Sequence, residues 1–157
     1  MSANSDPLPL LLFRIEAQRY ALPVAVVLRV LPMVAVSALP RAPDVALGVI
    51  NLQGTVIPVL DIRRRFGLPP RDYGPRAHFI VARTARRTLG LPVDEVLGVT
   101  EVALHAVAPA AAVLPQTRYV EGIVALTDGV LLIHDLEAFL SLEEEQRLDK
   151  SLGEIGG

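Results

Sequence analysis

Three histidines are candidate metal ligands in this sequence. His78, His105 and His134 lie far apart in the sequence, and none is part of a ligand spacing such as His-x3-His. A zinc site needs three or four converging ligands. We therefore expect structural roles for all three histidines and predict no metal site.

Two aspartates occupy matching places, because Asp61 and Asp135 each follow an apolar segment and precede a short amphipathic turn. Paired carboxylates can share a proton and drive hydrolysis. The same place is also that of a helix N-cap, where a carboxylate accepts a backbone N–H. The cap is the favoured interpretation, and a hydrolytic enzyme that uses the pair stays as an alternative.

Other catalytic and cofactor motifs are absent from the sequence. There is no cysteine, so disulfides, thiolate metal sites and cysteine nucleophiles are excluded. Neither a phosphate-binding glycine loop nor a Gly-x-Ser-x-Gly elbow occurs. The sequence predicts no catalytic residue and no cofactor.

A run of arginines could form a basic face: Arg63, Arg64, Arg65, Arg71, Arg76, Arg83, Arg86 and Arg87. Nucleic-acid binding is one interpretation. Lysine is almost absent, however, and no aromatic residues interleave as a stacking platform. Contact with proteins or a solvated surface is therefore favoured over RNA or DNA binding, which remains an alternative.

Charge is unevenly distributed although the net charge is only −2. Residues 1–93 hold 12 arginines and five acidic residues, a net +7, and residues 94–157 carry a net −9. This split predicts two lobes of opposite charge that favour oriented contact with other proteins. Drift of a solvated surface explains it equally well.

The start of the chain has no basic segment before its apolar run, which covers only Leu8–Phe13 and contains Pro9. Such a run is too short for a signal peptide or a membrane span. We therefore expect a cytoplasmic protein without membrane insertion.

Internal repetition organises the whole chain. Tyr20–Val30 and Leu89–Val99 are identical at six of 11 positions, and two further pairs of segments repeat in the same order: Gly48–Leu52 with Gly122–Leu126, and Asp61–Ile62 with Asp135–Leu136. Three echoes in one order indicate two copies of a supersecondary unit.

About ten short strands are predicted, since turn signals recur every eight to twelve residues. This pattern favours an all-β fold with short helices, built as two small barrels that have no free edges. Gln53-Gly54 predicts a tight hairpin, and Pro58 predicts an edge strand or a bulge. Ser141 and Glu144 have the spacing of a capping box for a C-terminal helix. Proline-rich connections at 37–44 and 109–115 are expected to be exposed, and the Pro- and Gly-rich link 68–75 is the expected boundary between the repeats.

The sequence resembles the CheW domain family of bacterial chemotaxis. The resemblance rests above all on Gly48–Leu68, and it extends to Tyr20–Val30, Leu39–Pro43, Leu89–Val96 and Tyr119–Gly122. It covers about residues 10–142, with repeats near 13–68 and 79–140, and leaves 143–157 as a C-terminal helix and tail.

The resemblance implies two intertwined, pseudo-symmetric five-stranded subdomains, each similar to a small SH3-type barrel. It also implies a stand-alone, non-enzymatic adaptor at receptor arrays. Family members couple chemoreceptor tips to the histidine kinase CheA, whose regulatory domain has the same fold, and other CheW-like domains are further partners. A CheW-type interaction module in another two-component pathway, such as surface motility or second-messenger control, is the alternative.

Motif segments matched to the family give the predicted partner-binding residues: Val27, Arg29, Val30, Gly48, Asn51, Gln53, Gly54, Val96, Gly98 and Val99. Core packing, or backbone geometry at Gly48 and Gly54, would equally explain these residue types. One departure is Gln53, where the family typically has arginine, because glutamine cannot make the charged bidentate bonds of a guanidinium. Either partner affinity is altered, or another arginine such as Arg63 or Arg29 supplies the charge.

Overall fold

The computed structural model describes residues 6–110 and 119–156. The strands of these residues are β1 (Pro7–Ile15), β2 (Gln18–Pro23), β3 (Val27–Pro32), β4 (Ala46–Leu52), β5 (Thr55–Leu60), β6 (His78–Arg83), β7 (Thr88–Val93), β8 (Glu95–Ala103), β9 (Ala108–Pro109), β10 (Val120–Leu126) and β11 (Gly129–His134). The helices are η2 (Val24–Val26), α1 (Ile62–Arg65), η3 (Leu104–Ala106) and α3 (Leu142–Gly156).

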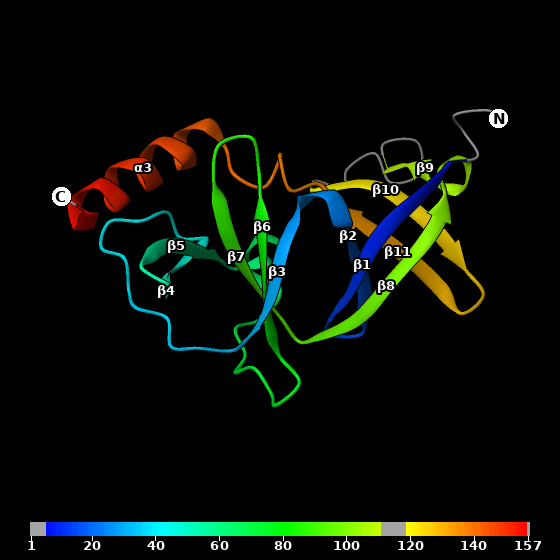
Figure 1. Ribbon diagram of the computed structural model, residues 1–157, viewed down its shortest axis with the longest axis horizontal. Helices are drawn as coiled ribbons and strands as arrows, with labels where there is room; N and C mark the ends of the chain where they lie inside the picture. The colour runs from blue at the N-terminus through cyan, green and yellow to red at the C-terminus, as the bar shows by residue number, and fades with distance from the viewer. Residues whose placement is uncertain (1–5, 111–118, 157) are drawn as a thin grey trace.

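The strands form two sheets that lie side by side along the long axis of the molecule (Figure 1). One sheet has six strands in the order β8-β1-β2-β11-β10-β9, and the other has five in the order β3-β6-β7-β5-β4. The prediction of a mostly β protein with two similar subdomains and a C-terminal helix is confirmed.

Each sheet mixes strands from both copies of the repeat. The β1–β2 hairpin of the first copy lies between β8 and β11 of the second, and the β6–β7 hairpin of the second lies between β3 and β5 of the first. The two parallel junctions also match, since Ile133 pairs with Ala21 and Val59 with Gly90. The equivalence of the two exchanges is the pseudo-symmetry that the repeat predicted, and the exchange itself is what the family resemblance implied.

The sheets are open rather than closed barrels. Strands β8 and β9 form the edges of the six-stranded sheet, and β3 and β4 form those of the five-stranded sheet. A bulge interrupts the ladder of β3 and another that of β8. Bulges bend a strand and increase its twist, and in this fold they lie on two of the four edge strands.

Four apolar clusters hold the described residues together, the smallest of them around Ala110, Val120 and Ile123. The largest lies between the sheets and includes Phe13 and Leu22 from one sheet with Ile80, Leu91 and Val93 from the other. A smaller cluster lies on the opposite face of each sheet. Since the largest cluster draws on both sheets, its burial couples them into one core.

The predicted hairpin at Gln53-Gly54 is present between β4 and β5. Gln53 has φ +53° and Gly54 has φ +89°, the positive values that a two-residue type I′ turn needs. The Asn51 Oδ1 accepts a hydrogen bond from the Gly54 N–H at 2.8 Å. The family-like tip of this hairpin is therefore well formed with glutamine in place.

The prediction of an edge strand at Pro58 is wrong, because β5 lies between β7 and β4. Val59 is the only residue of β5 that pairs with β7. The missing N–H of Pro58 therefore does not interrupt an extended ladder between β5 and β7. The bulge is in the partner strand instead, where Leu47 is the extra residue between Ala46 and Gly48.

The C-terminal helix α3 packs beside the five-stranded sheet (Figure 1). The predicted capping box is confirmed: the Ser141 N–H donates to Glu144 Oε1 at 2.9 Å, and the Glu144 N–H donates to Ser141 Oγ at 3.1 Å. Leu148 is fully buried in the central cluster, and Arg87 pairs with Glu145 at 3.2 Å. Among the described residues, no helix is long and apolar enough to cross a bilayer.

The expected division of charge between lobes does not follow the chain halves, because the copies exchange strands. Many opposite charges of the two halves pair within the molecule instead, as Arg65 does with Glu144 and Arg87 with Glu145. Of the described arginines between 63 and 87, only Arg83 has a side chain that makes no ion pair or hydrogen bond. The predicted basic face is thus largely neutralised. Of the connections, 37–44 and 68–75 are mostly exposed, and most of 109–115 lies outside the described residues.

Candidate protein-binding site

The histidines do not come together. His78 begins β6, His105 lies in η3 and His134 is buried at the end of β11. No group of three or more histidine, aspartate or glutamate side chains within 6–110 and 119–156 is placed to hold a metal ion.

The two aspartates play different local roles. Asp135 Oδ1 accepts the Ala138 N–H at 3.2 Å, as a cap would, but residues 136–140 form turns and no helix. Asp61 stands at the N-cap position of α1, but its carboxylate makes no capping bond and its Oδ1 has no partner within the described residues. Instead it lies near Tyr73, where burial and this negative charge raise the pKa of the phenol to about 12. The capping prediction for Asp61 is therefore wrong in its hydrogen bond, and the aspartates follow strands of different sheets.

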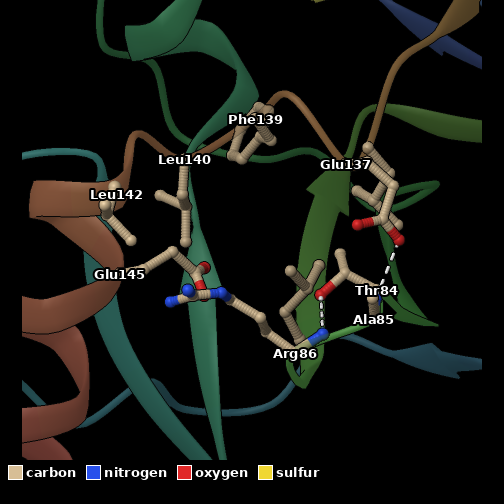
Figure 2. Close-up of a pocket in the computed structure, with 10 residues that line it drawn as sticks. Thr84, Ala85, Arg86, Glu137, Phe139, Leu140, Leu142 and Glu145 are labelled. Carbon is tan, nitrogen blue, oxygen red and sulfur yellow. Dashed lines mark hydrogen bonds and ion pairs between the residues drawn. The ribbon is translucent and has the colours of Figure 1, made fainter.

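A shallow pocket of about 270 Å³ lies between the β6–β7 turn and the segment that leads into α3 (Figure 2). Its two carboxylates are already engaged: Glu137 Oε1 accepts the Ala85 N–H at 2.8 Å, and Glu145 pairs with Arg87. Its lining includes no histidine. With no free acid–base pair, this pocket offers no catalytic constellation.

The edge strands β3 and β8 carry matching features. In β3, Leu28 is the extra residue between Val27 and Arg29, and in β8, Leu97 is the extra residue between Val96 and Gly98. Both bulged leucines face solvent, at 53% and 43% exposure. The exchanged repeat therefore presents one exposed leucine at the same place on an open edge of each sheet.

A valine follows each bulge after one residue. Val30 is 37% and Val99 is 64% exposed. Together Leu28, Val30, Leu97 and Val99 define what we call the two leucine edges. Exposed apolar groups beside unpaired strand edges are features of protein-binding surfaces.

The predicted binding residues separate into surface and structural groups. Seven of the predicted residues are exposed: Val30 and Val99 of the leucine edges, and Arg29, Asn51, Gln53, Gly54 and Gly98. Val27 and Val96 are partly buried and pack on the central cluster. Gly48 is buried in β4 and cannot touch a partner. Leu28 and Leu97 were missed, although their identity in both copies was a signal in the sequence.

Arg63, one of the two arginines considered as a substitute for the family arginine, is not at the surface. Its side chain is 3% exposed and is bound to Glu16 and Asp94. Burial acts to lower the pKa of the guanidinium, but its bonds to both carboxylates outweigh this and raise it. The hydrogen bond from Arg63 is also the main cause of the lowered pKa of Glu16. Arg29 remains exposed on β3, and within the described residues it forms no ion pair.

Comparisons with known proteins agree on one family. The model of the CheW-like domain matches residues 9–144. A probable chemotaxis protein CheW from Rhizobium etli is 31% identical over 92% of this chain and 95% of its own length, and a chemotaxis protein CheW from Klebsiella aerogenes is 30% identical over 88% and 85%. The crystal structure of the scaffolding protein TtCheW from Thermoanaerobacter tengcongensis superposes with a TM-score of 0.81 at 28% identity, over 88% of this chain and 96% of that one. The chain belongs to the CheW-like domain family of non-enzymatic chemotaxis adaptors.

Proposed function

We propose that this protein couples chemoreceptor tips to a CheA-type histidine kinase at cytoplasmic receptor arrays, and that the two leucine edges contact these partners. The observation that carries the proposal is the pair of equivalent bulges, each of which exposes a leucine on a free strand edge. Apolar side chains flanked by unpaired backbone groups suit a helical or β-rich protein partner.

Signal transfer requires only positioning in this proposal. The adaptor holds kinase and receptor in one arrangement, so that a small receptor shift changes the balance between kinase states. Of the exposed part of the predicted site, Arg29 and Gly98 each lie between the leucine and the valine of one leucine edge. The Asn51–Gly54 hairpin tip lies apart from both edges, at the turn between β4 and β5. Gly48 is left out of the contact surface, since it is buried.

The leucine edges are tested by Leu28→Asp and Leu97→Asp, measured by titration calorimetry against a receptor-tip fragment and the kinase regulatory domain. Both side chains are exposed, so the variants should remain folded. We expect each to weaken binding of at least one partner by about tenfold or more, the effect of losing an apolar contact residue. Val130→Asp, which changes a similarly exposed valine on β11, should leave both affinities unchanged. Wild-type affinities in all three variants would contradict the placement of the site.

Gln53→Arg tests the departure from the family pattern. Gln53 already has a left-handed backbone and an exposed side chain, so arginine fits without a change of fold. A guanidinium adds charged, bidentate hydrogen bonds, and we expect about three- to tenfold tighter binding of the receptor fragment or the kinase domain. Gln53→Met is the uncharged control and should give no gain. Equal affinities of the arginine variant and wild type for both partners would remove Gln53 from the site.

A further inference from the structure

A single buried guanidinium connects the two sheets. Arg63 lies in α1, directly after β5 of the five-stranded sheet. Its Nη2 donates to both carboxylate oxygens of Asp94 at 2.6 Å, and its Nη1 donates to Glu16 in the β1–β2 turn of the six-stranded sheet. Asp94 is the one residue between β7 and β8, where the chain crosses from one sheet to the other.

Three further hydrogen bonds hold the crossover at Asp94 to the β1–β2 hairpin. Asp94 Oδ2 accepts the Glu16 N–H at 2.7 Å, and the Asp94 N–H donates to the Arg14 carbonyl at 3.0 Å. Arg14 Nε in turn donates to Glu95, the first residue of β8, at 3.2 Å. The bulge at Leu97 begins two residues later. The start of the β8 leucine edge is thus fixed to Arg63 through a short chain of bonded residues.

The other copy of the repeat lacks this connection. Its crossover from β2 to β3 is the 3-10 turn η2, Val24–Val26, which contains no ionisable side chain. The residue that corresponds to Arg63 is Glu137, whose carboxylate accepts the N–H of Ala85 in the matching β6–β7 turn (Figure 2). Within the described residues, only the β8 crossover has an ionic attachment to the opposite sheet.

We propose that Arg63 is a positioning residue for partner binding: through Asp94 it fixes the β8 leucine edge relative to the sheet that carries the β3 leucine edge. The inference rests on the proposed function, in which a partner uses these edges. A surface held in its bound arrangement before contact loses less entropy on binding. Arginine suits this role because its planar fork grips a carboxylate in one geometry, whereas a lysine ammonium does not.

The positioning claim is tested without any partner by NMR of Arg63→Met. Residual dipolar couplings of the backbone amides report the orientation of each strand in solution. We expect the amides of residues 94–99 to depart from the wild-type orientation relative to β6 and β7. Arg65→Met is the matched control, since Arg65 lies in the same helix but pairs with Glu144 of α3, and it should leave residues 94–99 unchanged. Wild-type couplings for residues 94–99 in Arg63→Met would overturn the inference.

Binding supplies the second measurement, made by calorimetry at a temperature where circular dichroism shows each variant to be folded. Arg63→Met should lose about tenfold in affinity for the receptor-tip fragment, Arg63→Lys should lose less, and Arg65→Met should stay within about twofold of wild type. If Arg63→Met does not fold, Asp94→Asn takes its place, because the amide oxygen still accepts the Glu16 N–H while one negative charge is lost.

The two measurements separate the claims. Displaced couplings together with reduced affinity support the inference, and displaced couplings with unchanged affinity overturn the link between Arg63 and binding. A wild-type protein that binds neither the receptor fragment nor the kinase domain would reject the proposed function instead, and the couplings would still decide whether Arg63 positions β8.

Discussion

Gly48→Ala should destabilise the protein by at least about 4 kcal/mol, a loss that few single substitutions reach. A Cβ at Gly48 would lie 2.1 Å from the Ser37 carbonyl oxygen. The two segments cannot separate easily, because Ser37 and Val49 exchange two backbone hydrogen bonds, at 2.9 and 2.8 Å. The backbone at Gly48 also has φ +151°, which side chains with a Cβ rarely adopt. Relief would require breaking the bridge between the 37 segment and β4.

Two other glycines are the controls for Gly48→Ala, and urea unfolding measures all three variants. A Cβ at Gly122, the repeat counterpart, would meet the Val107 Cγ1 at 2.6 Å, a methyl group that can move, so a smaller loss is expected. Gly98 has φ +123° but no atom within 4 Å of the added Cβ, so only the backbone strain of about 1–3 kcal/mol is expected there. A stability for Gly48→Ala within 1 kcal/mol of wild type would contradict the close approach. The result matters for function, because loss of signalling in Gly48→Ala would report unfolding rather than a lost contact.

The repeat made most of the fold predictable, but the repeat alone could not show the exchange of strands, which only the family resemblance implied. The identity of Leu22 with Leu91 and of Gly48 with Gly122 shows that two units exist. It does not show which unit each hairpin joins. Pairing within a copy and pairing across copies place the same apolar residues inside, because both copies have the same alternation. Only the long-range register, such as Ile133 with Ala21, distinguishes the two arrangements.

Predictions from neighbouring residues failed where contacts distant in sequence determine the structure. Pro58 lies inside the sheet, where β5 forms a long ladder with β4 but meets β7 at a single residue pair, so a proline is tolerated there. Arg63 was grouped with a basic surface on the strength of its neighbours in sequence, although it is the buried member of that run. Its partners Glu16 and Asp94 are 47 and 31 residues away, a distance that no motif spacing reveals. Leu28 and Leu97 are exposed because of bulges, and apolar residues in a predicted strand give no sign of a bulge.

Acid should destabilise this protein through His134, beginning below about pH 6.5, the usual pKa of histidine. His134 is 1% exposed, and neither ring nitrogen has a hydrogen-bond partner within the described residues. Its ring packs edge-on against Phe66 and Phe139, with centroids 5.7 and 5.1 Å apart. Burial lowers its pKa in the folded protein to about 3. Between these two pKa values the unfolded chain binds a proton that the folded protein does not, so the free energy of unfolding falls as the pH falls.

The size of this effect follows from the gap between the two pKa values. One pH unit corresponds to about 1.4 kcal/mol, so wild type should lose about 2 kcal/mol between pH 6.5 and 5, and up to about 5 kcal/mol by pH 3. His134→Leu removes both the titration and the unpaired nitrogens. Urea unfolding should show that the free energy of unfolding of this variant, relative to wild type, is about 2 kcal/mol more favourable at pH 5 than at pH 7.5. His78→Leu is the control at a less buried histidine, whose Nδ1 lies 2.9 Å from the Arg76 carbonyl, and it should keep the wild-type loss. An equal loss of unfolding free energy in His134→Leu and wild type would contradict this prediction. It would mean that a hydrogen-bond partner stabilises protonated His134 in solution and that carboxylates alone govern the response to acid.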